Sequence, residues 1–249
     1  MIYGLYSSAA GAIAESARHD VIANNIANIS TPGFKADLAV FMERSPESVE
    51  GSLGAYATEA DGMGGGLFVS DTYTRHLQGP IEVTDNEFDL AIDGKGYFAV
   101  TDGRDTLYTR AGAFSRDDQG RLVTPDGSHF LADASGRAIT LPLSGEIKVA
   151  RDGTISANGE PFGAVGIYGF RDERRLAKAG SNLYDASATA RIEATGRIEQ
   201  GALESSAVSP AEEMANMILA MRGYEANMKM IKMQDESLSD LMTVGTVNV

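Results

Sequence analysis

The chain of 249 residues contains no cysteine and no tryptophan, and it lacks any run of 18 apolar residues. Without cysteine there is neither a disulfide scaffold nor a thiolate zinc site. Without a long apolar run, we expect no segment to span a membrane as a helix. The first 14 residues carry no basic residue ahead of their apolar stretch, so we expect no Sec-type signal peptide there.

Positive charge is also scarce. Lysine and arginine together number 21, against 35 aspartates and glutamates, which gives a formal net charge of −14. This balance argues against binding to nucleic acid or to an anionic membrane surface. It suits a protein whose copies stay apart until something assembles them. Hydrophobic residues make up 43% of the chain, which is enough for a core, and 28 glycines favour short strands and tight turns.

Residues 209–242 repeat apolar side chains in steps of three and four. This heptad pattern predicts a long helix that packs along a partner helix, although an amphipathic helix on the chain's own core would look the same. Ser209, Pro210 and Glu212 suit a helix start with a capping box. The predicted interaction seam consists of Met214, Met217, Met221, Tyr224, Met228, Ile231, Asp235, Leu238 and Met242, with Asp235 as its only polar member.

A second long helix is predicted over residues 2–29, which contain no proline and have glycine only near their start. Seven alanines along this helix are small enough to let the large methionine side chains of a partner helix approach closely. We therefore expect the two terminal helices to pack together as a coiled coil, with the middle of the chain inserted between them.

Three asparagines lie near the end of this helix. Asn24 and Asn28 are four residues apart and Asn25 and Asn28 three apart, so their carboxamides share one face. Carboxamides both donate and accept hydrogen bonds, so this face can bind another copy of itself. Asparagine is also ordinary at a frayed helix end, which is the simpler interpretation.

The helix should end near Ile29. Pro32 disfavours helical geometry in the residue before it, and Gly33 tolerates positive φ. Phe34 is expected to anchor the segment that follows. We include Pro32, Gly33 and Phe34 with the three asparagines among the candidate interaction residues.

The middle of the chain, residues 86–193, alternates short apolar runs with Asp-Gly or Asn-Gly pairs. Such pairs favour hairpin turns in which both central residues take positive φ. We expect an antiparallel β domain, either a sandwich or a partly closed barrel, and an α+β fold class. The expected strands cover residues 90–92, 97–100, 106–109, 121–123, 147–149, 154–156 and 165–170.

The connector between the first helix and this domain is polar over residues 43–66 and ends in a glycine-rich run. No lysine followed by serine or threonine comes after it, so a flexible connector is favoured over a phosphate-binding loop. Extended segments are expected at residues 67–69 and 72–74. The predicted organisation is a helix in 1–30 that pairs with 209–245, a linker and β connector in 31–85, a β domain in 86–193, a return strand in 194–208 and a helix in 209–249.

Sequences that imitate ligand sites lack the required context. Residues 94–99 match a dinucleotide fingerprint, but a strand follows where a helix is needed. Residues 89–100 begin like a calcium loop, but apolar residues occupy its third and twelfth ligand positions. The histidines His19, His76 and His129 lie on different expected elements without paired spacing. We expect no enzyme activity, no cofactor and no metal site.

Residues 23–35, Ala-Asn-Asn-Ile-Ala-Asn-Ile-Ser-Thr-Pro-Gly-Phe-Lys, together with the helix before them, closely resemble the N-terminal signature of the flagellar rod and hook proteins. Residues 213–227 resemble the matching signature at the family's other end, and residues 196–204 resemble its short strand before the last helix. The resemblance covers essentially the whole chain. It departs at Met221 and Gly223, where glutamine and alanine are usual, and at residues 205–208.

The resemblance implies a structural subunit of the flagellar rod, whose terminal helices polymerise into the axial tube with the β domain outside. Length and the single β domain are most similar to the FlgF-type proximal rod proteins, with the FlgG-type distal rod proteins as the alternative. The implied partners are other rod proteins, copies of the chain itself and the flagellar type III export apparatus. The implied location is the rod in the periplasmic space, with terminal segments that are disordered in the free monomer.

A hypothesis of another class is a secreted β-rich enzyme or adhesin that carries a helical stalk. It requires a ligand pocket with convergent polar groups on the β domain. The rod hypothesis requires instead that the seam residues of the last helix decide assembly.

Overall fold

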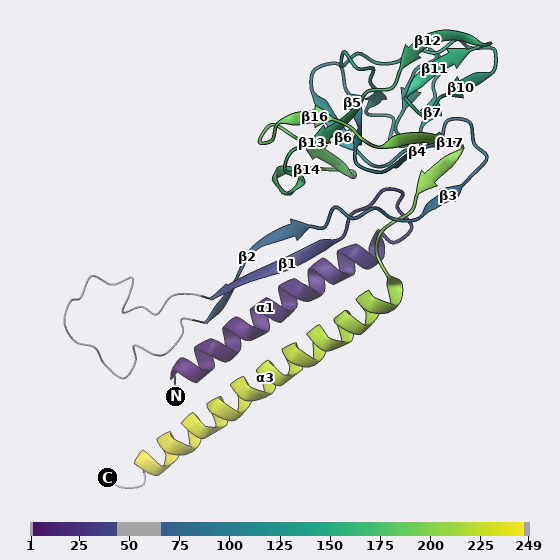
Figure 1. Cartoon of the computed structure of the whole chain (residues 1–249). Coiled ribbons are helices and arrows are strands. Elements are labelled where there is room, and N and C mark those ends of the chain that lie inside the picture. The colour runs from purple at the N-terminus through teal and green to yellow at the C-terminus, as the bar shows by residue number, and fades with distance from the viewer. Residues whose placement is uncertain (1, 44–65, 247–249) are drawn as a thin grey trace, which may run out of the picture. The chain divides into compact units, whose positions relative to one another are not determined.

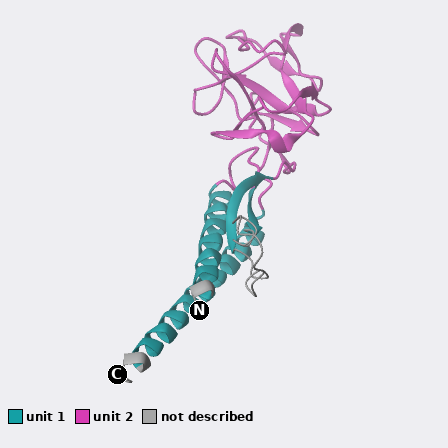
Figure 2. Ribbon diagram, turned by 90° about the vertical axis from the view of Figure 1, so that its left-hand side faces the viewer, with its two compact units in different colours: residues 1–27, 37–74, 209–249 teal, residues 28–36, 75–208 magenta. Residues whose placement is uncertain are grey.

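The computed structural model describes residues 2–43 and 66–246 and has an α+β fold (Figure 1). The chain divides into two compact units (Figure 2). Unit 1 comprises Met1–Ala27, Asp37–Thr74 and Ser209–Val249, and unit 2 comprises Asn28–Ala36 and Arg75–Val208. The predicted flexible connector lies almost entirely in residues 44–65, outside the described residues.

Unit 1 contains two long helices, α1 (Ile2–Ala27) and α3 (Pro210–Thr246). Both predicted helices are confirmed, and Pro210 is the first residue of α3, where its missing N–H costs no helical hydrogen bond. The 37 residues of α3 give a length of about 55 Å at 1.5 Å per residue. Among the described residues, neither helix is both long and apolar enough to cross a membrane.

The two helices lie side by side and run antiparallel (Figure 1). Gly4, near the start of α1, lies against Gln234 in the last third of α3, and Gly11 lies against Asn227. The expected pairing of the terminal helices is therefore present within one chain.

A two-stranded antiparallel hairpin completes unit 1 and packs along α1 (Figure 1). It pairs β1 (Asp37–Glu43) with β2 (Leu67–Thr74), and its register places Asp37 opposite Thr74. The predicted extended segments at 67–69 and 72–74 form one continuous strand. Strand β1 was not predicted separately, because its alternation of apolar residues is short and lies within the expected connector.

Unit 2 is built around a nine-stranded sheet with the order β14-β15-β6-β5-β9-β8-β7, to which β13 and β16 are joined through β5. Its central strands match the predicted ones, whereas several two- and three-residue strands were not predicted. The strands are β5 (Tyr97–Thr101), β6 (Thr106–Thr109), β7 (Ser115–Arg116), β8 (Leu122–Val123), β9 (Phe130–Leu131), β13 (Ile167–Phe170), β14 (Ala177–Gly180), β15 (Leu183–Asp185) and β16 (Arg191–Glu193).

Three smaller sheets and a 3₁₀ turn, η2 (Glu173–Arg175), complete unit 2. All strand pairs among the described residues are antiparallel, which confirms the mainly antiparallel α+β class. The small sheets pair β10 (Ile147–Val149) with β11 (Thr154–Ala157) and β12 (Glu160–Ala164), β4 (Leu90–Asp93) with β17 (Arg197–Gln200), and β3 (Ile81–Val83) with β18 (Ala202–Glu204).

Strand β5 is buried on both faces and forms the centre of unit 2. Phe98 and Val100 point into one apolar cluster, and Tyr97 and Ala99 point into a second, aromatic one. Because successive side chains of a strand point to opposite faces, one apolar run supplies both clusters.

The tight turns of unit 2 differ from the prediction. Of the Asp-Gly and Asn-Gly pairs expected to form hairpin turns, only Asn158-Gly159 has both residues at positive φ. In the Asp-Gly pairs the glycine alone has positive φ, and an aspartate such as Asp102 accepts backbone hydrogen bonds from the residues after it. A carboxylate that accepts N–H bonds within its own turn stabilises an Asx turn, so the aspartate keeps ordinary backbone angles.

Hydrogen bonds within one of these turns lower the pKa of Asp133. Its Oδ1 atom accepts hydrogen bonds from the hydroxyl of Ser135 at 2.6 Å and from the backbone N–H groups of Ser135 and Arg137. These bonds, led by the Ser135 hydroxyl, lower the pKa of Asp133 to about 2. Hydrogen bonds to a carboxylate favour its charged form.

We predict that Asp133→Asn destabilises the full chain at pH 6 by roughly 1 kcal/mol, allowing for partial solvent screening. The folded-state pKa lies below the unfolded one, so the charged carboxylate stabilises unit 2 above about pH 4 and this contribution is lost as the pH falls toward 2. Urea unfolding followed by near-ultraviolet circular dichroism at pH 6 and pH 2 measures the difference. Asp118→Asn, which changes an exposed aspartate, is the matched control. If the difference in free energy of unfolding between the wild type and Asp133→Asn is as large at pH 2 as at pH 6, the charge of Asp133 is not its cause.

Candidate assembly surfaces

The seam between α1 and α3 places glycines of one helix against polar side chains of the other. A Cβ atom on Gly4 would lie 2.9 Å from Nε2 of Gln234, and one on Gly11 would lie 2.9 Å from Nδ2 of Asn227. From Gly4 to Gly11 the chain advances by seven residues in α1, and the facing residue moves back by seven in α3, as expected for antiparallel helices. Glycine lets the helix backbones approach, and the amide of the partner helix fills the space.

The same register continues to the other end of α1. Gly223 of α3 lies against Glu15, with its ideal Cβ position 3.0 Å from the Glu15 Cδ atom. Nδ2 of Asn25 lies 3.5 Å from Oε1 of Glu213. Burial raises the pKa of Glu213, and the bond from Asn25 partly offsets that rise. Small and polar residues therefore line the seam from end to end.

The predicted seam coincides only in part with the face of α3 that packs on α1. Three of its residues are among the least exposed of α3, and the other least exposed residues lie on a neighbouring face, where glycines allow close helix contact. Of the predicted seam, Met217, Ile231 and Leu238 are half-buried, whereas Met214, Met221, Tyr224, Met228, Asp235 and Met242 are exposed. The least exposed residues of α3 include Glu213, Asn216, Ala220, Gly223, Asn227 and Gln234.

Large apolar side chains remain exposed around the rest of α3. Met214 is 56% exposed and Met242 is 74% exposed. Successive helical residues are 100° apart, so these side chains cannot all face one partner helix. We call them the α3 outer surface: Met214, Ile218, Leu219, Met221, Tyr224, Met228, Met230, Met233, Leu241 and Met242.

Asn25 is buried, with 1% of its surface exposed, and its carboxamide pairs with the backbone of Asp37. Nδ2 donates to the Asp37 carbonyl and Oδ1 accepts from the Asp37 N–H, both at 2.9 Å. The Asn25 carboxamide therefore makes the two hydrogen bonds to Asp37 that the backbone of a further strand would make at the edge of β1. The expectation that Asn25 is free to bind another copy is wrong, because both its donor and acceptor groups are used within unit 1.

The other two asparagines differ from Asn25. Asn24 is exposed on α1. Asn28, the first residue of unit 2, accepts a hydrogen bond at Oδ1 from the Thr31 hydroxyl at 3.2 Å, and its carbonyl accepts from the Thr31 N–H at 3.1 Å. Asn28 therefore closes the turn that follows α1.

The segment after this turn is held tightly inside unit 2. Gly33 has φ of 66°, and its N–H donates to the Glu204 carbonyl at 2.6 Å. A Cβ atom there would lie 2.4 Å from the carbonyl carbon of Arg110, so both the angle and the space require glycine. The Pro32 carbonyl accepts a hydrogen bond from Nδ2 of Asn182 at 2.9 Å.

Phe34 is buried in a small apolar cluster with Ala36 and Val208. The ammonium group of Lys178 lies 4.9 Å from the centre of its ring, within range of a cation–π contact. Pro32, Gly33 and Phe34 together fix the first segment of unit 2 against the segment that leaves it.

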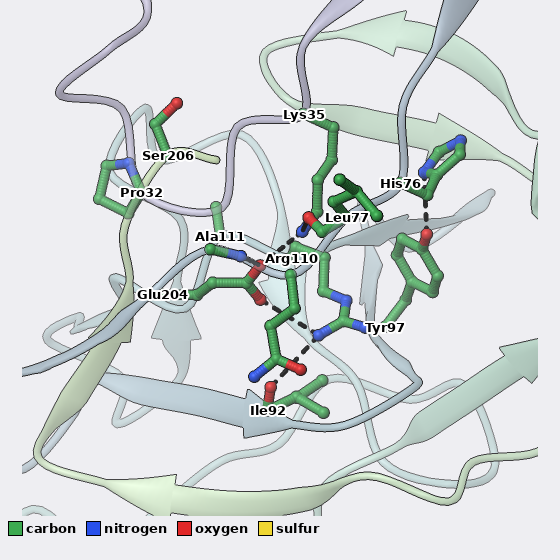
Figure 3. A network of polar contacts seen from close by, with 12 residues as sticks. Pro32, Lys35, His76, Leu77, Ile92, Tyr97, Arg110, Ala111, Glu204 and Ser206 are labelled. Carbon is green, nitrogen blue, oxygen red and sulfur yellow. Dashed lines mark hydrogen bonds and ion pairs between the residues drawn. The ribbon is translucent and has the colours of Figure 1, made fainter. Parts of the chain in front are cut away.

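A buried ionic cluster at this place was not predicted. Glu204 is fully buried at the end of β18, and Lys35 and Arg110 bind opposite sides of its carboxylate (Figure 3). Oε1 accepts from Nζ of Lys35 at 2.5 Å and from the N–H of Gly79 at 2.9 Å. Oε2 accepts from a guanidinium nitrogen of Arg110 at 3.1 Å. We call Lys35, Arg110 and Glu204 the Glu204 clasp.

Other groups complete the clasp. Arg110 also donates to the carbonyls of Ile92 and Gly94, at 3.2 and 2.8 Å, and its guanidinium lies 5.1 Å from the centre of the Tyr97 ring. The ammonium group of Lys35 also donates to the Leu77 carbonyl. Burial lowers the pKa of Lys35, and attraction to Glu204 offsets part of that shift. One carboxylate thus balances two buried cations.

Lys35 ends the N-terminal signature and Glu204 ends the signature of the return strand. Both residues therefore stand in the motifs that the sequence displays. Their pairing was missed because they lie 169 positions apart, and no spacing rule links them.

Three family models match separate parts of the chain. The model described as "Flagella basal body rod protein" matches residues 5–35, and "Flagellar hook protein FlgE/F/G D1 domain" matches residues 91–157. "Flagellar basal body rod FlgEFG protein C-terminal" matches residues 199–244. The chain is 36% identical over 265 residues to the flagellar basal-body rod protein FlgG of Bacillus subtilis, covering 98% of this chain and 99% of the relative.

The chain belongs to the flagellar basal-body rod protein family. It is also 36% identical over 235 residues to the rod protein FlgF of Caulobacter vibrioides, covering 92% of each chain. It is 33% identical over 263 residues to the rod protein FlgG of Borreliella burgdorferi, covering 96% of this chain and 97% of the relative. The chain is thus a structural rod protein and not an enzyme.

The family matches coincide with the surfaces described above. The first model spans most of α1 and the segment from Pro32 to Lys35, and the third spans Glu204 and most of α3. The second model, over residues 91–157, contains Arg110, so the family models match both terminal helices and all three residues of the Glu204 clasp.

We predict that Glu204→Gln destabilises unit 2 by about 3–5 kcal/mol, because it leaves two buried cations without their counter-charge. Urea unfolding of the full chain, followed by near-ultraviolet circular dichroism of the tyrosines, measures the loss. The double change Lys35→Met with Glu204→Gln should recover part of the stability. Glu193→Gln, which removes an exposed carboxylate from β16, is the matched control. Equal stability of the Glu204 and Glu193 variants would show that the clasp contributes nothing.

Proposed function

We propose that this rod subunit polymerises with copies of itself and with other rod proteins by burying the α3 outer surface. The observation that carries the proposal is the exposure of large apolar side chains around α3, outside its seam with α1. Large exposed apolar surface of this kind marks a site of interaction with another chain, and in α3 it lies beside a charged stripe that includes Arg222, Lys229 and Glu236. Among the elements of residues 2–43 and 66–246, α1 alone packs extensively on α3, and we infer that other chains cover the rest of the helix.

The chemistry of the helix seam supports this proposal. Gly4, Gly11 and Gly223 face polar side chains, so part of the contact of α1 with α3 is made by polar groups. Oε1 of Gln234 is buried without a hydrogen-bond partner in the seam, which weakens the contact further. Such a pair is marginal in isolation and suits terminal segments that become fully ordered only on assembly.

The proposed assembly is helical. Contacts between two different patches of identical subunits generate an open filament when the rotation between them does not close. We propose that terminal helices of many copies pack as coiled coils in the inner wall of an axial tube, and that the β unit, a sandwich or a partly closed barrel, faces outward. A formal net charge of −14 keeps subunits apart in solution before they assemble.

The proposed location is the rod in the periplasmic space, reached through the flagellar type III export apparatus. The names of the relatives support the rod as the location. Within the rod we favour the FlgF-type proximal position. The FlgG-type distal position is the second hypothesis, since relatives of both names match at 36% identity.

We predict that the double change Met221→Asp with Met228→Asp abolishes motility and lowers the amount of the chain in purified basal bodies by more than tenfold. The two residues are seven apart on the exposed face of α3, and burying two carboxylates without partners is strongly unfavourable. Near-ultraviolet circular dichroism should show that unit 2 stays folded. Quantitative mass spectrometry of basal bodies measures incorporation.

The matched control is Met221→Leu with Met228→Leu, which keeps both side chains apolar and should leave incorporation unchanged. Stripping the wild-type basal bodies stepwise toward the motor distinguishes the two rod positions. A few copies nearest the motor support the proximal rod, and many copies just below the hook support the distal rod. Normal incorporation of the aspartate variant would contradict assembly through α3.

A further inference from the structure

The sulfur of this chain is concentrated on one surface. Of the ten methionines, Met1, Met42 and Met63 lie elsewhere, and the other seven lie in α3. The chain has no cysteine, so methionine thioethers are its only sulfur groups. Oxidants that react with sulfur therefore act mainly on α3.

These thioethers are accessible in the free subunit. Six of the seven α3 methionines belong to the α3 outer surface, and they range from 43% exposed at Met228 to 74% exposed at Met242. The seventh, Met217, is half-buried beside the seam with α1. Met214, Met221 and Met228 are seven residues apart and form one stripe, whereas Met230 and Met233 lie on another side of the helix.

We propose that the α3 outer-surface methionines are a modification site, where hydrogen peroxide or another hydroperoxide forms sulfoxides in the free subunit and thereby blocks assembly. The inference rests on the proposed role of α3 in polymerisation. The thioether sulfur attacks the O–O bond of the peroxide. One oxygen is transferred to sulfur, which is oxidised by two electrons, and the other oxygen leaves as water from hydrogen peroxide or as the corresponding alcohol from an organic hydroperoxide.

The effect of a sulfoxide follows from the surface that carries it. A methionine side chain is flexible and apolar, so it adapts to a neighbouring helix in a packed interface. A sulfoxide is polar and chiral, and its oxygen requires a hydrogen-bond donor when it is buried. Oxidation at several positions around α3 would therefore exclude a subunit from the assembly, whereas a subunit already packed in the rod is protected by its neighbours.

The first test compares oxidation in two states of the full chain. The purified chain and intact basal bodies are exposed to the same dilute hydrogen peroxide, and peptide mass spectrometry quantifies each sulfoxide over time. We expect the six exposed α3 methionines to be oxidised at least tenfold faster in the free chain, with Met217 slower than Met242. Equal rates in the free chain and in basal bodies would overturn the proposal.

The second test uses variants that need no oxidant. Met230→Gln with Met233→Gln imitates two sulfoxides in length and polarity, and Met230→Leu with Met233→Leu is the matched apolar control. We expect the leucine pair in basal bodies at the wild-type level and the glutamine pair at less than a tenth of it. Far-ultraviolet circular dichroism checks that both variants keep their helices.

Normal incorporation of the glutamine pair would overturn the proposal, and so would loss of both pairs with intact helices. If the proposed assembly into the rod is itself wrong, the experiments give a different result. In that case the wild-type chain is missing from basal bodies altogether, while the oxidation rates of the free chain are still measured.

Discussion

Helix α3 exposes large apolar side chains over a wider surface than a single neighbouring helix can cover, and the organisation of unit 1 follows from this constraint. Helix α1 packs on the face of α3 that contains Ala220, Gly223 and Asn227, and Met217, Ile231 and Leu238 are half-buried. The hairpin of β1 and β2 packs along α1, and the remaining faces of α3 stay exposed. Exposed apolar side chains gathered in this way are typical of a surface that binds another protein, which is the basis of the proposed assembly.

Unit 2 satisfies its own burial requirements and differs from unit 1 in this respect. Strand β5 is apolar on both faces and supplies two clusters, while the Glu204 clasp ties the first segment of the unit to the last strand, β18. Gly33 permits this contact because no other residue fits between the turn and Arg110. A buried carboxylate with two cations contributes less to net stability than to a unique arrangement of the segments, since any mismatch leaves a charge uncompensated. The clasp thus sets the path of the chain at both ends of unit 2.

Apolar periodicity predicted helix α3, and the length of chain without proline helped to predict α1. The central strands, such as β5, were predicted from short apolar runs between Asp-Gly or Asn-Gly pairs. Periodicity could not predict which face of α3 packs on α1, since apolar residues surround that helix and the deciding contacts are made by glycines. The sequence indicated that Asn25 could bind another subunit, but its carboxamide pairs with the backbone of Asp37. Backbone groups are the same in every residue, so a sequence pattern cannot predict such a partner. Lys35 and Glu204 are too far apart for any spacing rule. Two-residue strands such as β7 and β9 are too short to show an alternation.

The central claim is that residues such as Met228 are exposed in the free subunit and buried in the rod. The chain has no cysteine, so Met228→Cys introduces its only thiol. The most direct measurement is the labelling of this thiol by a water-soluble maleimide, in the purified chain and in intact basal bodies that contain the variant. Our account predicts rapid labelling of the free chain and strong protection in the basal bodies. Labelling at the same rate in both would contradict the burial of α3 and the account that rests on it.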